Sequence, residues 1–344
     1  MSNYYDGTKL LSMKDINGNK PEIYMCTSNR SAGKTTYFNR LCVKRFLDKG
    51  EKFMLLYRYK YELDSCHEMF FKDIKALFFP SLEMTSIQKG KGVYRELFLN
   101  DKPCGYAVSI NSADNIKKHS HEFSDTKRIL FDEFQSETNT YCPDEINKFI
   151  SIHTSVARGQ GEFVRYVPVY MISNPVTILN PYYVEMGITD RLNENTKFLK
   201  GDGFVLEQGY VDAASKAQRS SGFNRAFAGN KYVAYSAENV YLNDSKTFIE
   251  KVVGKSKYMA TIKYNNVNYG VRSFPELGII YCDNKADMTF PVKISVTLDD
   301  HNVNYVMLKN NEFFIDNLRF YFSHGCFRFK NQKCKEAILN LLKY

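Results

Sequence analysis

The first 185 residues predict an α/β fold in which helices cover both faces of a mostly parallel sheet. Short apolar segments alternate there with longer segments whose apolar residues recur every three or four positions. The short segments are apolar at nearly every residue, which is typical of parallel strands buried on both faces. Regular alternation of such strands with helices predicts a layered parallel sheet.

The elements of this region follow in chain order. Residues 22–27 (EIYMCT) are the first expected strand, and residues 35–49 the first helix, which Gly50 ends. A later helix is expected to begin at Pro143, since proline is favoured in the first helical turn. Further strands are expected at 52–59, 105–110, 128–134 and 169–172, and further helices at 61–78 and 143–158.

The pattern changes beyond residue 175. Residues 176–230 are polar and rich in Asn and Gly, and they predict a linker region with at least one helix, within 213–229; the linker domain is assigned to 186–230. Residues 231–344 predict a β-rich α+β domain that begins with a hairpin. Its strands are expected at 257–264, 269–274, 278–283 and 292–298, followed by a helix at 333–343. The predicted domains are therefore 1–185, 186–230 and 231–344.

Composition narrows the class of protein. Of 344 residues, 44% are hydrophobic and 25% are charged, as in ordinary globular proteins. No apolar run reaches the length of a membrane span, and a signal peptide is not evident, so we expect a cytoplasmic protein without a membrane partner. Eight single cysteines without a CxxC pair predict reduced thiols. The net charge of +9 permits nucleic acid as a partner, but a solvated basic surface explains it equally well.

The strongest motif is CTSNRSAGKTTYF, residues 26–38, between an expected strand and an expected helix. A phosphate-binding loop needs small residues around the anion, a helix N-terminus that points at it, and a lysine and a hydroxyl that reach phosphate and Mg²⁺. Lys34 and Thr35 supply the last two, whereas Ser28 replaces the usual first glycine. The alternative is a chance GKT at an ordinary helix start. The predicted nucleotide contacts are Ser28, Asn29, Arg30, Ser31, Ala32, Gly33, Lys34, Thr35 and Thr36.

An acidic pair follows about 100 residues later, at the end of the apolar segment RILFDEF. Asp132 can hold Mg²⁺ together with Thr35, and Glu133 can polarise the water that attacks the γ-phosphate. A solvated acidic pair at a strand end is common, but one at this distance from a phosphate loop is not. Together the two motifs predict a P-loop NTPase of the additional-strand, catalytic-glutamate type that uses ATP and Mg²⁺.

Several cations are candidates for a role in catalysis. Arg30 lies inside the loop, and Arg158 ends an expected helix before the glycine-rich segment 159–161. An arginine there can act as a finger on the phosphates of a neighbouring subunit, or it can simply favour the negative end of the helix dipole. Lys117 and Lys118 are weaker candidates for the same role.

Other polar residues have less specific patterns. Lys89 and Lys91 lie in a basic, glycine-rich expected loop, 86–95, and could contact a DNA backbone, as could Lys117 and Lys118. A solvated surface loop explains the first two somewhat better. Asn174 follows the strand 169–172 and could sense a γ-phosphate, although a plain turn is the simpler interpretation.

The chain resembles a known family. The segments that carry the resemblance are SNRSAGKTT, LLYRYKYEL, ILFDEF, ARGQG and ISNP. The chain is similar to the DNA-packaging ATPases, or encapsidation proteins, of small podophages with protein-primed linear genomes. The arginine within the loop also resembles that of large terminases, the packaging motors of other tailed phages. The resemblance covers residues 20–185 well and rests beyond them on length and domain order.

The resemblance implies a homo-oligomeric, pentameric ring that docks on a procapsid portal in the host cytoplasm and pumps double-stranded DNA with ATP. By motif, it implies that Lys34 and Thr35 bind phosphate and Mg²⁺, Asp132 binds Mg²⁺ and Glu133 is the catalytic base. Arg158 matches a finger that acts between subunits. Arg58 follows the second strand at a place where the family also carries arginine, and terminase-type loops share the serine at position 28.

The resemblance also implies a C-terminal domain related to RNase H-type nucleases but vestigial. The acids of this region do not stand in the middle of an expected strand, as the first metal ligand of such a nuclease would; they are Asp283, Asp287, Asp299, Asp300 and Asp316. Three alternatives remain: a helicase-like ring translocase, a terminase with an active nuclease, and a capsid accessory protein that binds DNA without hydrolysing ATP.

Overall fold

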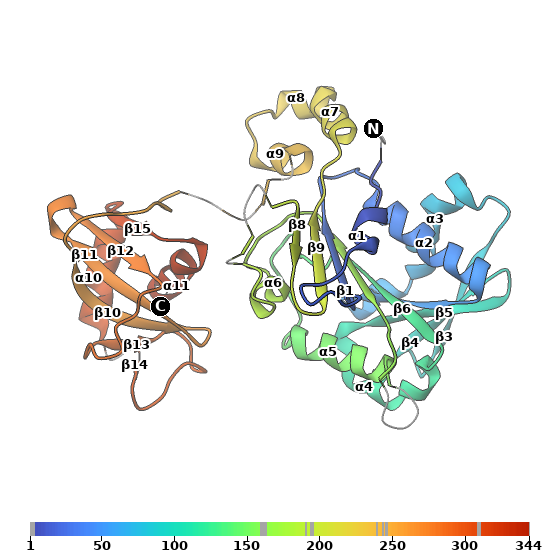
Figure 1. Ribbon diagram of the computed structural model, residues 1–344, viewed down its shortest axis with the longest axis horizontal. Coiled ribbons are helices and arrows are strands. Elements are labelled where there is room, and N and C mark those ends of the chain that lie inside the picture. Colours follow the sequence, from blue (N-terminus) through green and yellow to red (C-terminus); the bar gives the residue numbers. More distant parts are fainter. Residues whose placement is uncertain are drawn as a thin grey trace. The chain divides into compact units, whose positions relative to one another are not determined.

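The computed structural model describes residues 4–158, 164–189, 191–192, 196–238, 240–242, 244, 247–307 and 311–343. The chain divides into two compact units, Met1–Asn243 and Asp244–Tyr344 (Figure 1). None of the helices in the described ranges combines the length and the apolar character needed to cross a bilayer.

The first unit is built on a sheet in which nine strands are described, in the order β3-β4-β5-β2-β6-β7-β1-β9-β8. The six strands from β5 to β9 in that order are parallel, and antiparallel partners complete both edges. The strands are β1 (Ile23–Thr27), β2 (Lys52–Tyr57), β3 (Met84–Lys89), β4 (Tyr94–Leu99), β5 (Lys102–Ser109), β6 (Thr126–Asp132), β7 (Val169–Ser173), β8 (Phe198–Lys200) and β9 (Phe204–Gln208). The predicted parallel α/β sheet is confirmed.

Helices cover both faces of this sheet because each strand sends alternate apolar side chains to opposite faces (Figure 1). In β1, Tyr24 and Cys26 join the core under α2 and α3, whereas Met25 joins the core under α4 and α5. The helices are α1 (Thr8–Ser12), α2 (Lys34–Lys49), α3 (Cys66–Phe78), α4 (Ala113–Lys118), α5 (Glu145–Val156) and α6 (Pro181–Glu185), with 3₁₀ turns η1 (Lys60–Leu63), η2 (Ile110–Ser112) and η3 (Ser120–Phe123).

Three helices follow β9 and lie together at one end of this unit (Figure 1). They are α7 (Asp212–Ser220), α8 (Gly222–Ala226) and α9 (Lys231–Glu238). They include the helix expected within 213–229. The structural division at residue 243 differs from the predicted domain ends, because β8 and β9 of the linker range extend the main sheet. Helix α9, which the sequence pattern assigned to the C-terminal domain, also belongs to the first unit.

Other local predictions need correction. Residues 86–95 are not a loop: they span the end of β3, a turn and the start of β4, which pair as a hairpin. The helix expected at 61–78 is divided into η1 and α3. The helix expected from Pro143 begins at Glu145, because its N-cap residue Asp144 has left-handed backbone angles (φ 56°), and it ends at Val156.

The second unit has a six-stranded sheet among its described residues, in the order β14-β13-β10-β11-β12-β15. The predicted hairpin is confirmed by the antiparallel pairing of β10 and β11. Helix α10 was not predicted, and β13 is shorter than expected. The elements are β10 (Lys257–Tyr264), β11 (Val267–Phe274), η4 (Pro275–Leu277), β12 (Ile279–Asp283), β13 (Lys293–Ser295), β14 (Val306–Met307), α10 (Glu312–Ser323), β15 (Phe327–Phe329) and α11 (Gln332–Leu342).

Candidate active site

The phosphate-loop motif connects the carboxyl end of β1 to the N-terminus of α2, as predicted. Gly33, the residue before α2, has φ 91°, which favours glycine, and Ser31 has φ 59°. Ser28 does not have a positive φ; it is buried, and its N–H donates to the carbonyl of Ser173 at 3.3 Å. The backbone therefore has no need of glycine at position 28, which explains why serine can stand there.

Lys34 lies at the start of α2 with its side chain buried. Its Nζ donates to Oδ1 of Asn174 at 2.6 Å. Asn174 follows β7, which lies between β1 and β6. Burial lowers the pKa of Lys34, whereas the nearby carboxylate of Asp132 raises it. The tip of β7, for which a plain turn was the simpler interpretation, therefore contacts the lysine of the loop.

Asp132 is the last residue of β6 and lies near the start of α2. Burial raises the pKa of its carboxyl group to about 6, while the charge of Lys34 and a hydrogen bond from Thr35 act in the opposite direction. Parallel strands thus bring Lys34, Thr35 and Asp132 together at one edge of the sheet. Next to them, Glu133 is exposed, has φ 56°, and donates its N–H to Oδ1 of Asp132 at 2.9 Å.

A buried arginine fixes the backbone after the acidic pair. Nη1 of Arg58 donates to the carbonyl of Glu133 at 3.2 Å, and Nη2 donates to that of Phe134 at 2.8 Å. Its Nε pairs with Glu145 at 3.0 Å, and both side chains are buried. The hydroxyl of Tyr182 also donates to Glu145, at 2.7 Å. Arg58 is therefore a positioning residue that holds Glu133 in its left-handed conformation.

Arg30 is tied to α9. Its guanidinium pairs with Glu137, and its backbone N–H donates to the carbonyl of Ser236 at 3.0 Å. The rings of Tyr232 and Tyr235 lie 5.3 and 5.8 Å from its Cζ atom. Its Nε is buried and has no hydrogen-bond partner within the described ranges. An anion in the loop could satisfy that donor.

These residues fit a magnesium nucleotide. No group of three or more His, Cys, Asp or Glu side chains that could hold a metal occurs in the part of the chain that the structure describes. Thr35 and Asp132 together offer one hydroxyl and one carboxylate. That small set suits Mg²⁺, which is usually held by one or two protein oxygens together with phosphate and water.

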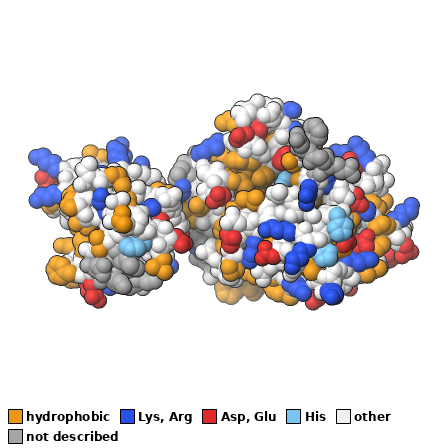
Figure 2. All heavy atoms as spheres, turned by 90° about the horizontal axis from the view of Figure 1, so that it is seen from below, with side chains coloured by type: hydrophobic (Ala, Val, Ile, Leu, Met, Phe, Trp, Pro, Cys, Tyr) orange, Lys and Arg blue, Asp and Glu red, His pale blue; other side chains and the backbone are white. Residues whose placement is uncertain are grey.

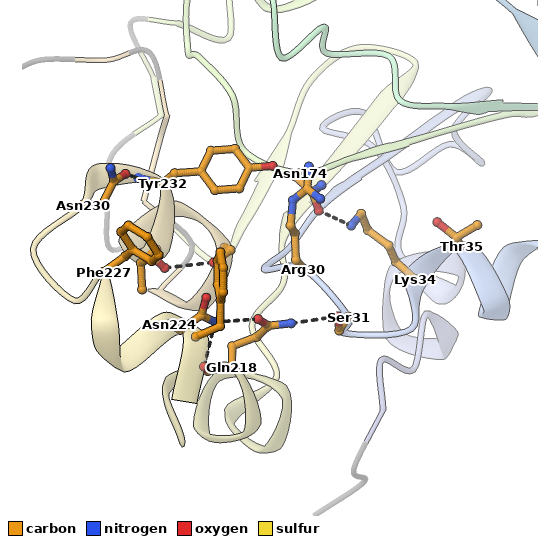
Figure 3. A pocket seen from close by; sticks show the side chains of 13 residues that line it. Arg30, Ser31, Lys34, Thr35, Asn174, Gln218, Asn224, Phe227, Asn230 and Tyr232 are labelled. Atoms are coloured by element: carbon orange, nitrogen blue, oxygen red, sulfur yellow. Dashed lines mark hydrogen bonds between the residues drawn. The ribbon is translucent and has the colours of Figure 1, made fainter. Parts of the chain in front are cut away.

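The loop opens into a pocket of about 580 Å³. Figure 3 shows Lys34 and Thr35 at one end of it, and residues of α7, α8 and α9 at the other. The far wall includes Gln218, Phe223, Asn224, Phe227, Asn230 and Tyr232. No sequence motif marks these residues, which lie about 190 positions after the loop, so the wall was not predicted.

The remaining sequence candidates lie elsewhere. Arg158 is exposed and lies two residues beyond the end of α5. Its backbone forms a β-bridge with Val164. The glycine-rich segment 159–161 lies outside the described residues. Lys89 and Lys91 are on the hairpin at the sheet edge opposite β8, with Lys89 paired to Glu96 at 3.5 Å. Lys117 and Lys118 are exposed on α4. None of these residues lines the pocket at the loop.

The face of the first unit that Figure 2 shows is not uniformly basic. Lys and Arg side chains alternate there with Asp and Glu on the first unit. Lys117 itself lies 3.8 Å from Asp114 on the same helix. The positive charge on this face is therefore dispersed rather than gathered into one stripe.

Four of the five aspartates considered in the second unit form bonds within that unit; they are Asp283, Asp287, Asp300 and Asp316. Asp283 is buried at the end of β12 and pairs with Arg272 at 3.1 Å. Asp300 is buried and accepts the N–H groups of Asn265 and Asn266 at 2.8 and 2.7 Å, at the turn of the hairpin. Asp287 accepts from Thr289, and Asp316 pairs with Arg319 on α10.

Comparison with known proteins identifies the family of the chain. The family described as Podovirus DNA encapsidation protein (Gp16) matches residues 1–344. The DNA packaging protein of Bacillus phage phi29 is 28% identical over 344 residues, covering 99% of this chain and 97% of the phage protein. That of Bacillus phage B103 is 29% identical over 307 residues, covering 88% and 91%.

A solved structure supports the same relationship over the whole chain. A chain of the bacteriophage phi29 viral genome packaging motor assembly has a TM-score of 0.71 and 25% identity, and the match covers 99% of this chain and 100% of that one. The protein belongs to the Podovirus DNA encapsidation protein (Gp16) family.

Proposed function

We propose that this protein is the ATPase of a viral genome-packaging motor, which hydrolyses ATP to move double-stranded DNA into a procapsid. The observation that carries the proposal is the convergence of Lys34, Thr35 and Asp132 at one edge of the parallel sheet. Family membership over residues 1–344 supports the coupling to DNA packaging.

Each residue of the site has its own role in the proposed hydrolysis of ATP. Lys34 neutralises the phosphates, and the backbone N–H groups of the loop and of the first turn of α2 surround them. Thr35 and Asp132 would hold Mg²⁺, which would supply charge that shields the phosphates. Glu133 accepts a proton from the water that attacks the γ-phosphate, and Asn174 holds Lys34 in place before the nucleotide arrives.

The assembly is proposed to be a ring, pentameric by resemblance, that works in the host cytoplasm while docked on the portal of the procapsid. The support is that the phi29 relative was solved as part of a motor assembly. Lys89, Lys91, Lys117 and Lys118 remain candidates for contact with the DNA backbone, since all four lie on the hairpin and α4 of the first unit.

The three ranges predicted from the sequence are proposed to have different functions, with α9 moved to the first of them. Residues 1–185 carry the phosphate loop and the acidic pair. Residues 186–230, expected as a linker domain, are proposed to complete the sheet with β8 and β9 and to supply the far wall of the pocket. Helix α9 is added to this first part because it contacts Arg30. The C-terminal part is proposed to bind DNA or the docking partner without cutting DNA, because Asp283 and Asp300 are engaged in structural bonds.

Arg158 is proposed to act on the nucleotide of a neighbouring subunit, because it is exposed just beyond α5 and does not line the pocket of its own subunit. Arg158→Ala rings should bind ATP and fail to hydrolyse it. Mixed rings of Arg158→Ala and Glu133→Gln subunits should regain part of the ATPase rate, since some interfaces then combine an intact arginine with an intact glutamate.

Mixing of the two subunits would be verified by mass measurement of the rings. If verified mixed rings do not regain ATPase activity, Arg158 acts within its own subunit, or Arg30 is the cation that contacts the phosphates.

The test of the proposed function is the ATPase rate of the purified protein, measured alone, with double-stranded DNA, and with DNA and procapsids. We expect the highest rate with both, and DNA protected from added nuclease. Unwinding of duplex DNA with a preference for single strands would favour a helicase-like translocase, and absence of ATP turnover under all three conditions would contradict the proposal.

A further inference from the structure

The pocket at the phosphate loop extends beyond the loop itself. Its volume of about 580 Å³ extends from Lys34 and Thr35 to α8 and α9. Pockets of roughly 300–1,000 Å³ commonly enclose a whole small molecule. If the phosphates occupy the N-terminus of α2, the opposite end is left for the remainder of the nucleotide.

Aromatic side chains gather at that opposite end. Phe223 of α8 is 74% exposed, Phe227 is 51% exposed and Tyr232 of α9 is 43% exposed, yet all three line the pocket. The ring centroids of Phe223 and Phe227 are 5.0 Å apart. These exposed rings add little to the core, and together they offer an apolar surface inside the pocket to a ligand that has an apolar face.

We propose that Phe223, Phe227 and Tyr232 form the base-binding wall of the nucleotide site. The inference rests on the proposed function, since it assigns the base of the nucleotide whose phosphates the loop would hold. A heteroaromatic base can stack on such rings, and a purine offers the larger face. The sugar and the phosphates then extend from this wall toward Lys34.

Polar contacts hold the wall in place relative to the loop. Nε2 of Gln218 donates to the Ser31 hydroxyl at 3.1 Å, and Nδ2 of Asn224 donates to Oε1 of Gln218 at 2.9 Å (Figure 3). The Tyr232 hydroxyl donates to Glu137 at 3.3 Å, and Glu137 in turn pairs with Arg30. The aromatic wall is therefore connected to the loop on two sides and is organised before the nucleotide binds.

The experiment measures how much the base contributes to binding, apart from the phosphates. The full-length protein is titrated calorimetrically with ATP and with tripolyphosphate, both with Mg²⁺. Phe227→Leu keeps an apolar side chain but removes the ring. Since stacking of a base on an aromatic ring contributes roughly 1–3 kcal/mol, ATP affinity should fall about 5- to 150-fold. Tripolyphosphate affinity should not change.

Two variants serve as controls. Phe227→Tyr keeps the ring and should keep ATP affinity. Phe313→Leu removes an aromatic side chain of α10 that is 85% exposed, and it should alter neither affinity. Melting temperatures of all variants should match that of the wild type, because each changed side chain is exposed.

The outcomes distinguish the inference from the function on which it rests. An unchanged ratio of ATP to tripolyphosphate affinity in both Phe227→Leu and Phe223→Leu would overturn the inference, and the proposed function would stand. The same would follow if these variants weakened only DNA binding or ring assembly. Wild-type protein that binds neither compound would overturn the proposed function itself.

Discussion

The two units of this protein use their buried polar groups in different ways. In the first unit, Lys34 and Asp132 lie at the carboxyl ends of parallel strands, where burial shifts the pKa of each toward the neutral form. In the second unit, Asp283 and Asp300 are fully engaged with Arg272 and with backbone N–H groups. Perturbed pKa values of this kind are typical of reaction sites.

The difference follows from the two sheets. Parallel strands all end at one edge, so that loops from β1, β6 and β7 meet there and can surround a ligand. The second sheet is mixed, and its central hairpin of β10 and β11 turns back after Tyr264. Its polar residues serve that turn and its edges. We therefore propose that the chemistry belongs to the first unit and that the second unit binds DNA or the docking partner.

The largest effect is expected at Lys34. Lys34→Ala removes the positive charge on the phosphates, and ATP binding and turnover should both be lost. Lys44→Ala is the matched control, because Lys44 is exposed on the same helix. Binding is measured by calorimetry and turnover by phosphate release. Turnover close to that of the wild type in the Lys34 variant would remove the nucleotide site from the first unit.

The buried ion pair that positions Glu133 should affect both stability and catalysis. Arg58→Met leaves Glu145 charged and unpaired in the core, which typically costs about 3–5 kcal/mol of unfolding free energy. Arg45→Met is the control, since Arg45 is exposed on α2. Denaturant unfolding measures the loss.

A second variant separates the two roles of Arg58. Arg58→Met combined with Glu145→Leu removes both charges and should recover much of the stability. ATPase activity should remain low, because the carbonyls of Glu133 and Phe134 still lack their donor. Full activity in this double variant would show that ATP hydrolysis does not depend on the hydrogen bonds from Arg58 to the backbone at Glu133 and Phe134.

The smallest effect on activity is expected in the second unit. Asp283→Asn weakens the bond to Arg272 and should cost about 1–3 kcal/mol of stability while ATP turnover is retained. Wild-type and variant proteins are also incubated with supercoiled plasmid and Mg²⁺ or Mn²⁺. Metal-dependent cleavage that disappears in Asp283→Asn or Asp299→Asn would give the second unit an active nuclease and reverse the contrast between the units.

The sequence was sufficient to predict the parallel sheet and the loop between β1 and α2, because both depend on local patterns. Lys34, Thr35 and Asp132 were predicted by motif, and the structure brings them together. Strand β9 was missed: its five residues are flanked by polar segments, and only its pairing with β1 reveals that it belongs to the sheet.

Other parts of the site depend on contacts between distant segments. Arg58 reaches Glu133 and Glu145, which lie 75 and 87 positions later in the chain. The aromatic wall on α8 and α9 lies in a range whose composition predicted a linker. Neither contact has a local pattern, so neither could be derived from spacing. The hairpin of β3 and β4 was mistaken for a loop because its turn contains Gly90 and Gly92, both with positive φ.

The central claim is that hydrolysis in the first unit drives DNA movement, and Glu133→Gln tests it most directly. Glutamine keeps the size of the side chain but cannot accept the proton, so the variant should bind ATP and hydrolyse it about 10²–10⁴-fold more slowly. With procapsids, DNA and ATP, DNA protected from added nuclease should be abundant for the wild type and absent for the variant. Protected DNA at the wild-type level with Glu133→Gln would contradict the account.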